Sequence, residues 1–143
     1  MCGIVGLFLK DKSLEPKLGK MLTEMLITMT DRGPDSAGIA IYSEETIGRA
    51  KMTVQSDAPE TAFKGLDTVL SEAISASVSM QVRSTHAILD IPTGSTADVR
   101  SELTKLGIRV MSRGHNLEIY KEVGLPQDVA AQFDITTMSG SHG

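Results

Sequence analysis

Aromatic residues are scarce in this sequence: only 3% of its 143 residues are Phe or Tyr, and Trp is absent. A hydrophobic core must therefore be built from Leu, Ile, Val and the eight Met. The hydrophobic content of 41% and the charged content of 22% are normal for a globular protein. The shortage of rings thus does not exclude a sizeable core.

Several other shortages exclude classes of protein. The formal net charge is -4 and no dense Lys/Arg patch occurs, which argues against nucleic acid or an anionic membrane as the main partner. No apolar run approaches the roughly 20 residues of a membrane span, and the N-terminus lacks the pattern of a secretory signal. A single cysteine excludes an internal disulfide, so we expect a reducing compartment and a cytoplasmic protein.

Hydrophobic periodicity and turn residues predict a mixture of strands and helices. Strands are predicted at residues 2–9, 39–42, 49–54, 78–91 (as one strand or two), 108–112 and 117–123. Helices are predicted at residues 14–30, 59–75, 95–106 and 126–133. Ser13 is the expected N-cap of the first helix, and Gly107 is expected to end the third. Strands 39–42 and 49–54 are expected to form a hairpin.

The only cysteine, Cys2, directly follows the initiator methionine in "MCGIVG". A free cysteine is most often a small buried hydrophobe. However, an initiator methionine is readily removed before a small residue, and Cys2 would then carry both a thiol and a free α-amine. The amine has a reference pKa of about 7.7–8.0, so it can accept the thiol proton near neutral pH. Cys2 is therefore a candidate nucleophile with its own general base.

Two glycines near Cys2 allow two interpretations. Glycine weakens a strand unless another backbone or a ligand approaches closely. Beside a nucleophile, Gly3 and Gly6 suit the approach of a substrate. Tight packing of the sheet is the alternative.

The motif "MCGIVG", followed by a helix and then "RGPDSAGIAIY", resembles the start of class II glutamine amidotransferases, the N-terminal-nucleophile glutaminases. The two motifs are about thirty residues apart, and the pair is more specific than either alone. The segment 118–143 also looks like the stretch that leads into the family's next active-site strand. The overall pattern is most similar to glutamate-synthase-like glutaminase subunits, with residues 57–117 as an insert.

The resemblance implies an α+β fold, a partial αββα sandwich with an α/β insert, in which residues 1–143 are the N-terminal part of the glutaminase domain. It implies that Cys2 attacks the side-chain amide of glutamine, forms a thioester and releases ammonia. Arg32 and Gly33 would position the nucleophile. Gly3, Pro34, Asp35 and Ser36 would support the site. An ordinary ion pair across the loop is the alternative role for Arg32 and Asp35.

The family's later motifs, which bind the glutamine and stabilise the oxyanion, are not present up to Gly143. The substrate-binding residues are therefore expected beyond it, and we expect negligible glutaminase activity from this chain alone. His115-Asn116 resembles part of an oxyanion motif, but Leu117 stands where glycine is needed. We interpret this segment as a turn between two strands.

The implied partners are glutamine and a synthase subunit that accepts ammonia, for which a flavin enzyme is one candidate. No cofactor or metal is expected within this chain. A non-catalytic module that docks on a synthase is the main alternative. A metal or redox site using Cys2 with His86, His115 or His142 is a third reading, which the absence of metal-like spacing disfavours.

Overall fold

The computed structural model describes residues 3–143, and its mixture of helices and strands confirms the predicted α+β class. The described residues form two compact units. Unit 1 comprises residues 3–44 and Ile119–Gly143, and unit 2 comprises Glu45–Glu118. Unit 2 includes the predicted insert at 57–117 and begins earlier in the chain; its status as an insert in a larger domain stays a prediction. Within residues 3–143, no helix is both long and apolar enough to cross a membrane.

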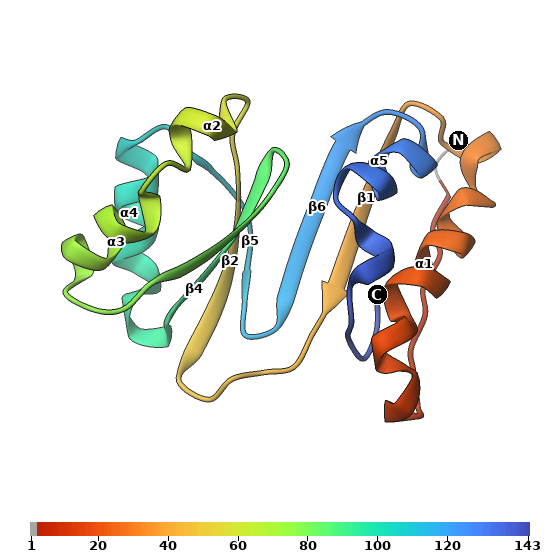
Figure 1. Ribbon diagram of the computed structural model, residues 1–143, viewed down its shortest axis with the longest axis horizontal. Helices are drawn as coiled ribbons and strands as arrows, with labels where there is room; N and C mark the ends of the chain where they lie inside the picture. Colours follow the sequence, from red (N-terminus) through yellow and green to blue (C-terminus); the bar gives the residue numbers. More distant parts are fainter. Residues whose placement is uncertain (1–2) are drawn as a thin grey trace. The chain divides into compact units, whose positions relative to one another are not determined.

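Unit 2 is a four-stranded antiparallel sheet with helices on one face (Figure 1, yellow to teal). Its strands are β2 (Arg49–Gln55), β3 (Ser79–Arg83), β4 (His86–Pro92) and β5 (Arg109–Gly114). Its helices are α2 (Pro59–Ala62), α3 (Leu66–Ile74), the 3-10 turn η3 (Thr93–Ser95) and α4 (Thr96–Lys105). The spatial order β3-β4-β2-β5, with α3 and α4 as crossovers, is the split βαβ or ferredoxin-like arrangement.

The core of unit 2 lies between the sheet and its helices. Helix-facing residues of the two central strands pair across the ladder: Ala50 with Ile91, Met52 with Leu89, and Val54 with Ala87. Leu70 of α3 and Leu103 of α4 pack into the same cluster and are fully buried. Alternate residues of each strand thus point to one apolar layer, as the period-2 pattern requires.

Turn residues decide the element boundaries in unit 2. The helix predicted at 59–75 is divided into α2 and α3 at Gly65, which has φ +67°. The segment predicted as one strand or two at 78–91 forms two strands with a turn at Ser84, whose φ is +53°. Gly107, with φ +72°, follows the end of α4 as predicted.

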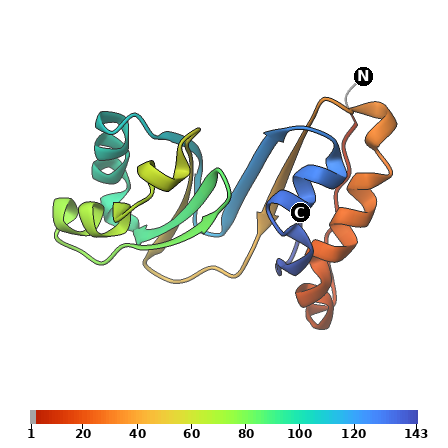
Figure 2. The same cartoon turned by 45° about the horizontal axis from the view of Figure 1, so that its top comes forward.

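Unit 1 contains a two-stranded sheet and the helices that pack on it (Figures 1 and 2, red to orange and blue). The strands are β1 (Ser36–Tyr42) and β6 (Leu117–Val123), which run in opposite directions. The helices are α1 (Leu18–Ile27) and α5 (Pro126–Gln132), with 3-10 turns η1 (Lys12–Lys17), η2 (Thr30–Arg32) and η4 (Ile135–Thr137). The strand predicted at 39–42 is thus confirmed as part of β1, and the helix predicted at 126–133 as α5.

Helix α1 contacts the C-terminal part of the chain very closely through Gly19. The Gly19 N–H donates to the Met138 carbonyl oxygen over 2.9 Å. A Cβ on Gly19 would overlap the Ile135 carbonyl oxygen and lie 2.8 Å from that of Met138. Only glycine fits at this crossing, which joins two segments more than a hundred residues apart.

For the first half of the chain, the predicted hairpin and the predicted N-cap are wrong, and the predicted helix is confirmed in part. Strands β1 and β2 do not form a hairpin, because β1 pairs with β6 while β2 is paired on both sides, by β4 and β5. The helix predicted at 14–30 is confirmed in its middle part as α1, while the 3-10 turns η1 and η2 stand at its two ends. Ser13 is not its N-cap: the Asp11 carboxylate accepts the Ser13 backbone N–H over 2.9 Å and caps η1 instead.

Among the described residues, the buried strand predicted at 2–9 is wrong for residues 3–6, and only residues 7–9 pair with another segment, 141–143. Residues 3–7 are not in a strand, and a single bridge joins Phe8 to His142. Ile4 is 94% exposed and Phe8 67% exposed, whereas Leu9 is buried. A strand needs a hydrogen-bonded neighbour, and residues 3–6 make no backbone hydrogen bond to any other described residue.

Candidate functional site

The predicted "RGPDS" residues lie at the junction between α1 and β1. The hydroxyls of Thr28 and Thr30 donate to the carbonyls of Met25 and Ile27, each over 2.6 Å, as α1 ends. The chain then makes the single turn η2, and the Gly33 N–H donates to the Thr30 carbonyl over 3.2 Å. Strand β1 begins three residues later. These local bonds satisfy the helix end and direct the turn toward the sheet.

Gly3 lies directly against this turn. A Cβ on Gly3 would be 2.5 Å from Met29 Cε and 3.3 Å from Arg32 Cβ. The N-terminal segment therefore packs on the end of the α1 region at the position next to Cys2. Cys2 itself lies outside the described residues. Gly6 has an ordinary contact only, since its Cβ would be 3.9 Å from the Gly143 carbonyl oxygen.

A cavity of about 260 Å³ in unit 1 brings the two sequence motifs together. Its lining includes five of the predicted residues: Gly3, Gly33, Pro34, Asp35 and Ser36. Met29 and Pro126 form further parts of the wall. The backbone of Arg32 belongs to η2, and its exposed side chain contacts Gly3 from outside this lining. The arrangement provides a small hollow beside Gly3 with both polar and apolar lining.

Sequence reasoning missed two residues of this region, Gly124 and Pro126. The Gly124 N–H donates to the Asp35 carbonyl oxygen over 3.0 Å, so this loop fixes the backbone of the "RGPDS" turn. Gly124 has φ +138°, which strongly favours glycine, and Pro126 begins α5. The three-residue pattern Gly-x-Pro indicates a turn in the sequence. No feature of the neighbouring residues indicates that this turn contacts a segment about ninety residues earlier.

The described ion pairs give no support to the alternative role for Arg32 and Asp35. Both residues are described, and no ion pair joins them to each other or to another described residue. The backbone carbonyl of Asp35 accepts a hydrogen bond from the Gly124 N–H. The structure thus shows a turn tied by main-chain contacts, with both charged side chains exposed.

The histidines lie in three different surroundings. His115 and Asn116 form the turn between β5 and β6, as interpreted from the sequence. His86 is fully buried in β4, with its Nδ1 3.0 Å from the Thr85 hydroxyl. His142 stacks on Tyr42 with ring centroids 4.1 Å apart. Within residues 3–143, no group of three or more His, Cys, Asp or Glu residues could hold a metal ion.

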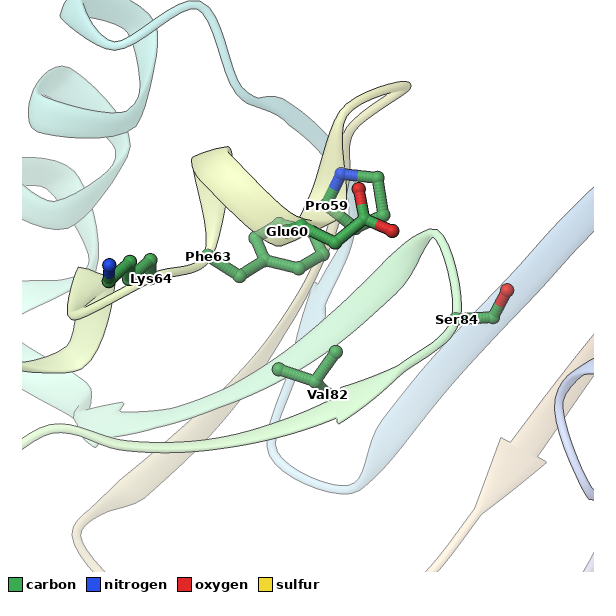
Figure 3. Close-up of a pocket in the computed structure, with 6 residues that line it drawn as sticks. All are labelled: Pro59, Glu60, Phe63, Lys64, Val82 and Ser84. Atoms are coloured by element: carbon green, nitrogen blue, oxygen red, sulfur yellow. The ribbon is translucent and has the colours of Figure 1, made fainter.

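A larger hollow, of about 480 Å³, lies in unit 2 (Figure 3). It is lined by Pro59, Glu60, Phe63, Lys64, Val82 and Ser84. The Phe63 ring forms part of an apolar floor with Val82, while the charged Glu60 and Lys64 are exposed to solvent. None of the predicted site residues lines it. The smaller cavity of unit 1 is therefore the better candidate for chemistry.

Comparison with known proteins supports a relationship to glutamine amidotransferases. No family model matches the sequence. The chain is 56% identical over 145 residues to "Glutamine amidotransferase-like protein GlxB" of Rhizobium meliloti, covering 100% of this chain and 48% of that protein. It is 30% identical over 155 residues to a protein of Methanothermobacter thermautotrophicus that also has glutamine amidotransferase in its name, covering 99% of this chain and 50% of that protein. The chain thus spans about half the length of these curated relatives.

Proposed function

We propose that this chain is the N-terminal part of a class II, glutamate-synthase-like glutamine amidotransferase domain. The observation that carries the proposal is the cavity of unit 1, because it brings Gly3, next to Cys2, together with residues 33–36 of the second motif. The two relatives support the glutamine amidotransferase family. The class, the mechanism and the partner are parts of the proposal.

In the proposed reaction, removal of Met1 frees the α-amine of Cys2. The amine accepts the thiol proton, directly or through one water, and the thiolate attacks the side-chain amide carbon of glutamine. The carbon–nitrogen bond then breaks, and the proton passes to the departing nitrogen, which leaves as ammonia. Water hydrolyses the resulting thioester to glutamate and restores the thiol.

The described residues would serve this reaction by positioning. Gly3 allows the N-terminal segment to lie against Met29 and the Arg32 side chain without a clash. The bond from Gly124 to Asp35 fixes the facing turn. Small shifts of such supporting contacts misplace a nucleophile and lower its effective concentration. Ammonia would pass to a synthase partner, for which a flavin enzyme is one candidate.

The proposal is tested on the full polypeptide that the native gene encodes. We expect an intact mass that lacks Met1, and ammonia release from glutamine that falls at least about 1000-fold in Cys2→Ala. Gly33→Ala is expected to lower kcat/KM about tenfold because its methyl group would enter the cavity. Gly94→Ala is the matched control. At both Gly33 and Gly94 an added Cβ has no atom within 4 Å, but Gly94 lies in unit 2, away from this cavity.

The 143-residue chain by itself is expected to release no more ammonia than its Cys2→Ala variant. One missing oxyanion donor alone costs about 100–1000-fold in rate. Retention of Met1 in the native protein, or equal ammonia release from Cys2→Ala, would overturn the proposal. Either result would favour the alternative, a non-catalytic module that docks on a synthase, because a blocked amine cannot act as the base.

A further inference from the structure

The four-stranded sheet of unit 2 ends in two edge strands, β3 and β5. An edge strand presents a row of backbone N–H and C=O groups that its own sheet does not use. β5 has two features that usually protect such an edge, namely the exposed charges of Arg109 and Arg113 and an irregular register against β2. β3 pairs with β4 in regular register over five residues, and its one charged residue is the last, Arg83. β3 is therefore the less protected edge.

The side chains of β3 alternate between the two faces of the sheet. Met80 lies opposite Leu89 of β4, and Val82 lies opposite Ala87. Both of these partners belong to the apolar core, so Met80 and Val82 face the helices. Met80 is partly buried against the core, whereas Val82 is 50% exposed. The helix layer thus leaves one apolar side chain of the edge strand half uncovered.

Val82 also borders the hollow of about 480 Å³ in unit 2 (Figure 3). The Phe63 ring continues the apolar floor beside it. The exposed Glu60 and Lys64 line the same hollow, so it carries one acid and one base and has no excess of either charge. An apolar hollow beside an unprotected strand edge is a surface suited to association by strand addition.

The sequence of β3, "SMQVR", is complementary to itself when two copies run antiparallel. With Gln81 opposite its own symmetry mate, Met80 of each copy lies opposite Val82 of the other. On the opposite face, Ser79 of each copy lies opposite Arg83 of the other. Apolar residues therefore meet on the helix side, and no two like charges are directly opposed. A shift by one residue would place the helix-side residues of one copy on the wrong face of the other.

We propose that β3 pairs with β3 of a second copy of this protein, about a two-fold axis at Gln81. The sheets of the two copies of unit 2 then form one continuous sheet with the helices of both copies on the same side. This symmetric contact satisfies both β3 edges at once and closes as a dimer. A stable interface usually buries about 800 Å² on each partner, so we expect the apolar hollow beside Val82 to be covered together with the strand.

Disulfide cross-linking of the protein that the native gene encodes tests this register, with single cysteines placed in a Cys2→Ala background. In Gln81→Cys the two cysteines would face each other across the axis, with Cα atoms about 4.5–5.5 Å apart, within reach of a disulfide. In Ser79→Cys, on the same exposed face, they would be about 13 Å apart along the strands. We expect at least about tenfold more oxidised dimer from Gln81→Cys. An equal mixture of Ser79→Cys and Arg83→Cys should cross-link, because these residues would lie opposite each other.

Two valines of unit 2 with nearly equal exposure provide a second test. Val82 is 50% exposed and Val69, in α3, is 49% exposed. Lysine on a strand edge opposes pairing, so Val82→Lys should raise the dimer dissociation constant at least about 100-fold in sedimentation over a concentration series. Val69→Lys should leave this constant within about twofold of the parent. A parent that stays monomeric, equal cross-linking of Gln81→Cys and Ser79→Cys, or equal dissociation constants in the two lysine variants would overturn the proposal.

Discussion

The two units differ in how far each completes its own structure. Unit 2 is one continuous stretch, Glu45–Glu118, and its four strands and helices enclose a contiguous apolar core. Unit 1 is assembled from two segments far apart in the sequence, and its named sheet has two strands. The motifs that indicate chemistry are in unit 1, so the candidate site is assembled from segments that lie far apart in the sequence.

This difference predicts where the protein is most sensitive to substitution. Unit 1 buries its own apolar side chains, among them Leu18, Ile41 and Phe133, but these come from segments far apart in the sequence that meet at close crossings. The apolar core of unit 2 is built from one continuous stretch of chain. Three substitutions or measurements, from the largest expected effect to the smallest, test the comparison.

Gly19→Ala should damage unit 1 most. The added Cβ would overlap the Ile135 carbonyl oxygen, a backbone atom that cannot move alone. We expect the free energy of unfolding to fall by about 4 kcal/mol, which far exceeds the gain of about 1 kcal/mol from the better helix propensity of Ala. Hydrogen exchange should show unit 1 open while β2 and β4 remain protected.

Gly94→Ala is the control for that experiment, because an added Cβ there has no neighbour within 4 Å. Its stability should stay within about 0.5 kcal/mol of the parent. Equal losses of stability in the two glycine variants would contradict the expectation that the Gly19 crossing matters most. Simultaneous opening of both units in Gly19→Ala would contradict their independence.

Leu70→Ala should have the next largest effect, in unit 2. Leu70 is fully buried in the core, so its truncation should cost about 3 kcal/mol in urea unfolding. Its neighbour Val69 is 49% exposed, and Val69→Ala should change stability by no more than about 0.5 kcal/mol. Hydrogen exchange in α1 should be the same in both variants. If Leu70→Ala increased hydrogen exchange only in unit 1, the expectation that Leu70 stabilises unit 2 would be wrong.

The smallest effect concerns the cap of η1 in unit 1. Hydrogen bonds from the Ser13 hydroxyl and then from its backbone N–H hold the pKa of the Asp11 carboxyl below its ordinary value. Because the folded pKa is the lower one, this cap stabilises the fold above the unfolded pKa, and its contribution is lost as pH falls through the folded pKa. Asp11 is fully exposed, so the change in stability should be slight.

A carboxyl NMR titration checks this shift directly. In Ser13→Ala the hydroxyl is missing, so the pKa of Asp11 should move up toward its ordinary value. The fold of unit 2 should not respond. An unchanged pKa in Ser13→Ala would show that the hydroxyl is not the main cause.

Local sequence patterns predicted most elements of both units. In unit 2 the strands at β2, β4 and β5 and the helix α4 follow from alternation, helical period and the Gly107 stop. In unit 1, β1, α5 and the turn at residues 33–34 were equally visible. These features depend on side chains within one or two turns of each other, and such interactions are encoded by neighbouring residues.

The candidate site was predicted only in part. The motif pair indicated Gly3 and residues 33–36, and the structure places all five on one cavity. Gly124 and Pro126 were not predicted, because their contact with the turn joins segments about ninety residues apart. Cys2 lies outside the described residues, so its catalytic role stays a prediction.

The sequence by itself determined the α+β class, most of the helices and strands, and the resemblance on which the proposed chemistry rests. Only the tertiary structure decided that β1 pairs with β6, and that residues 7–9 pair with 141–143. The physical reason is that propensity acts within a segment, whereas a strand forms only where another segment supplies its hydrogen bonds. Residues 3–6 have strand-like side chains, and no such neighbour lies among the described residues.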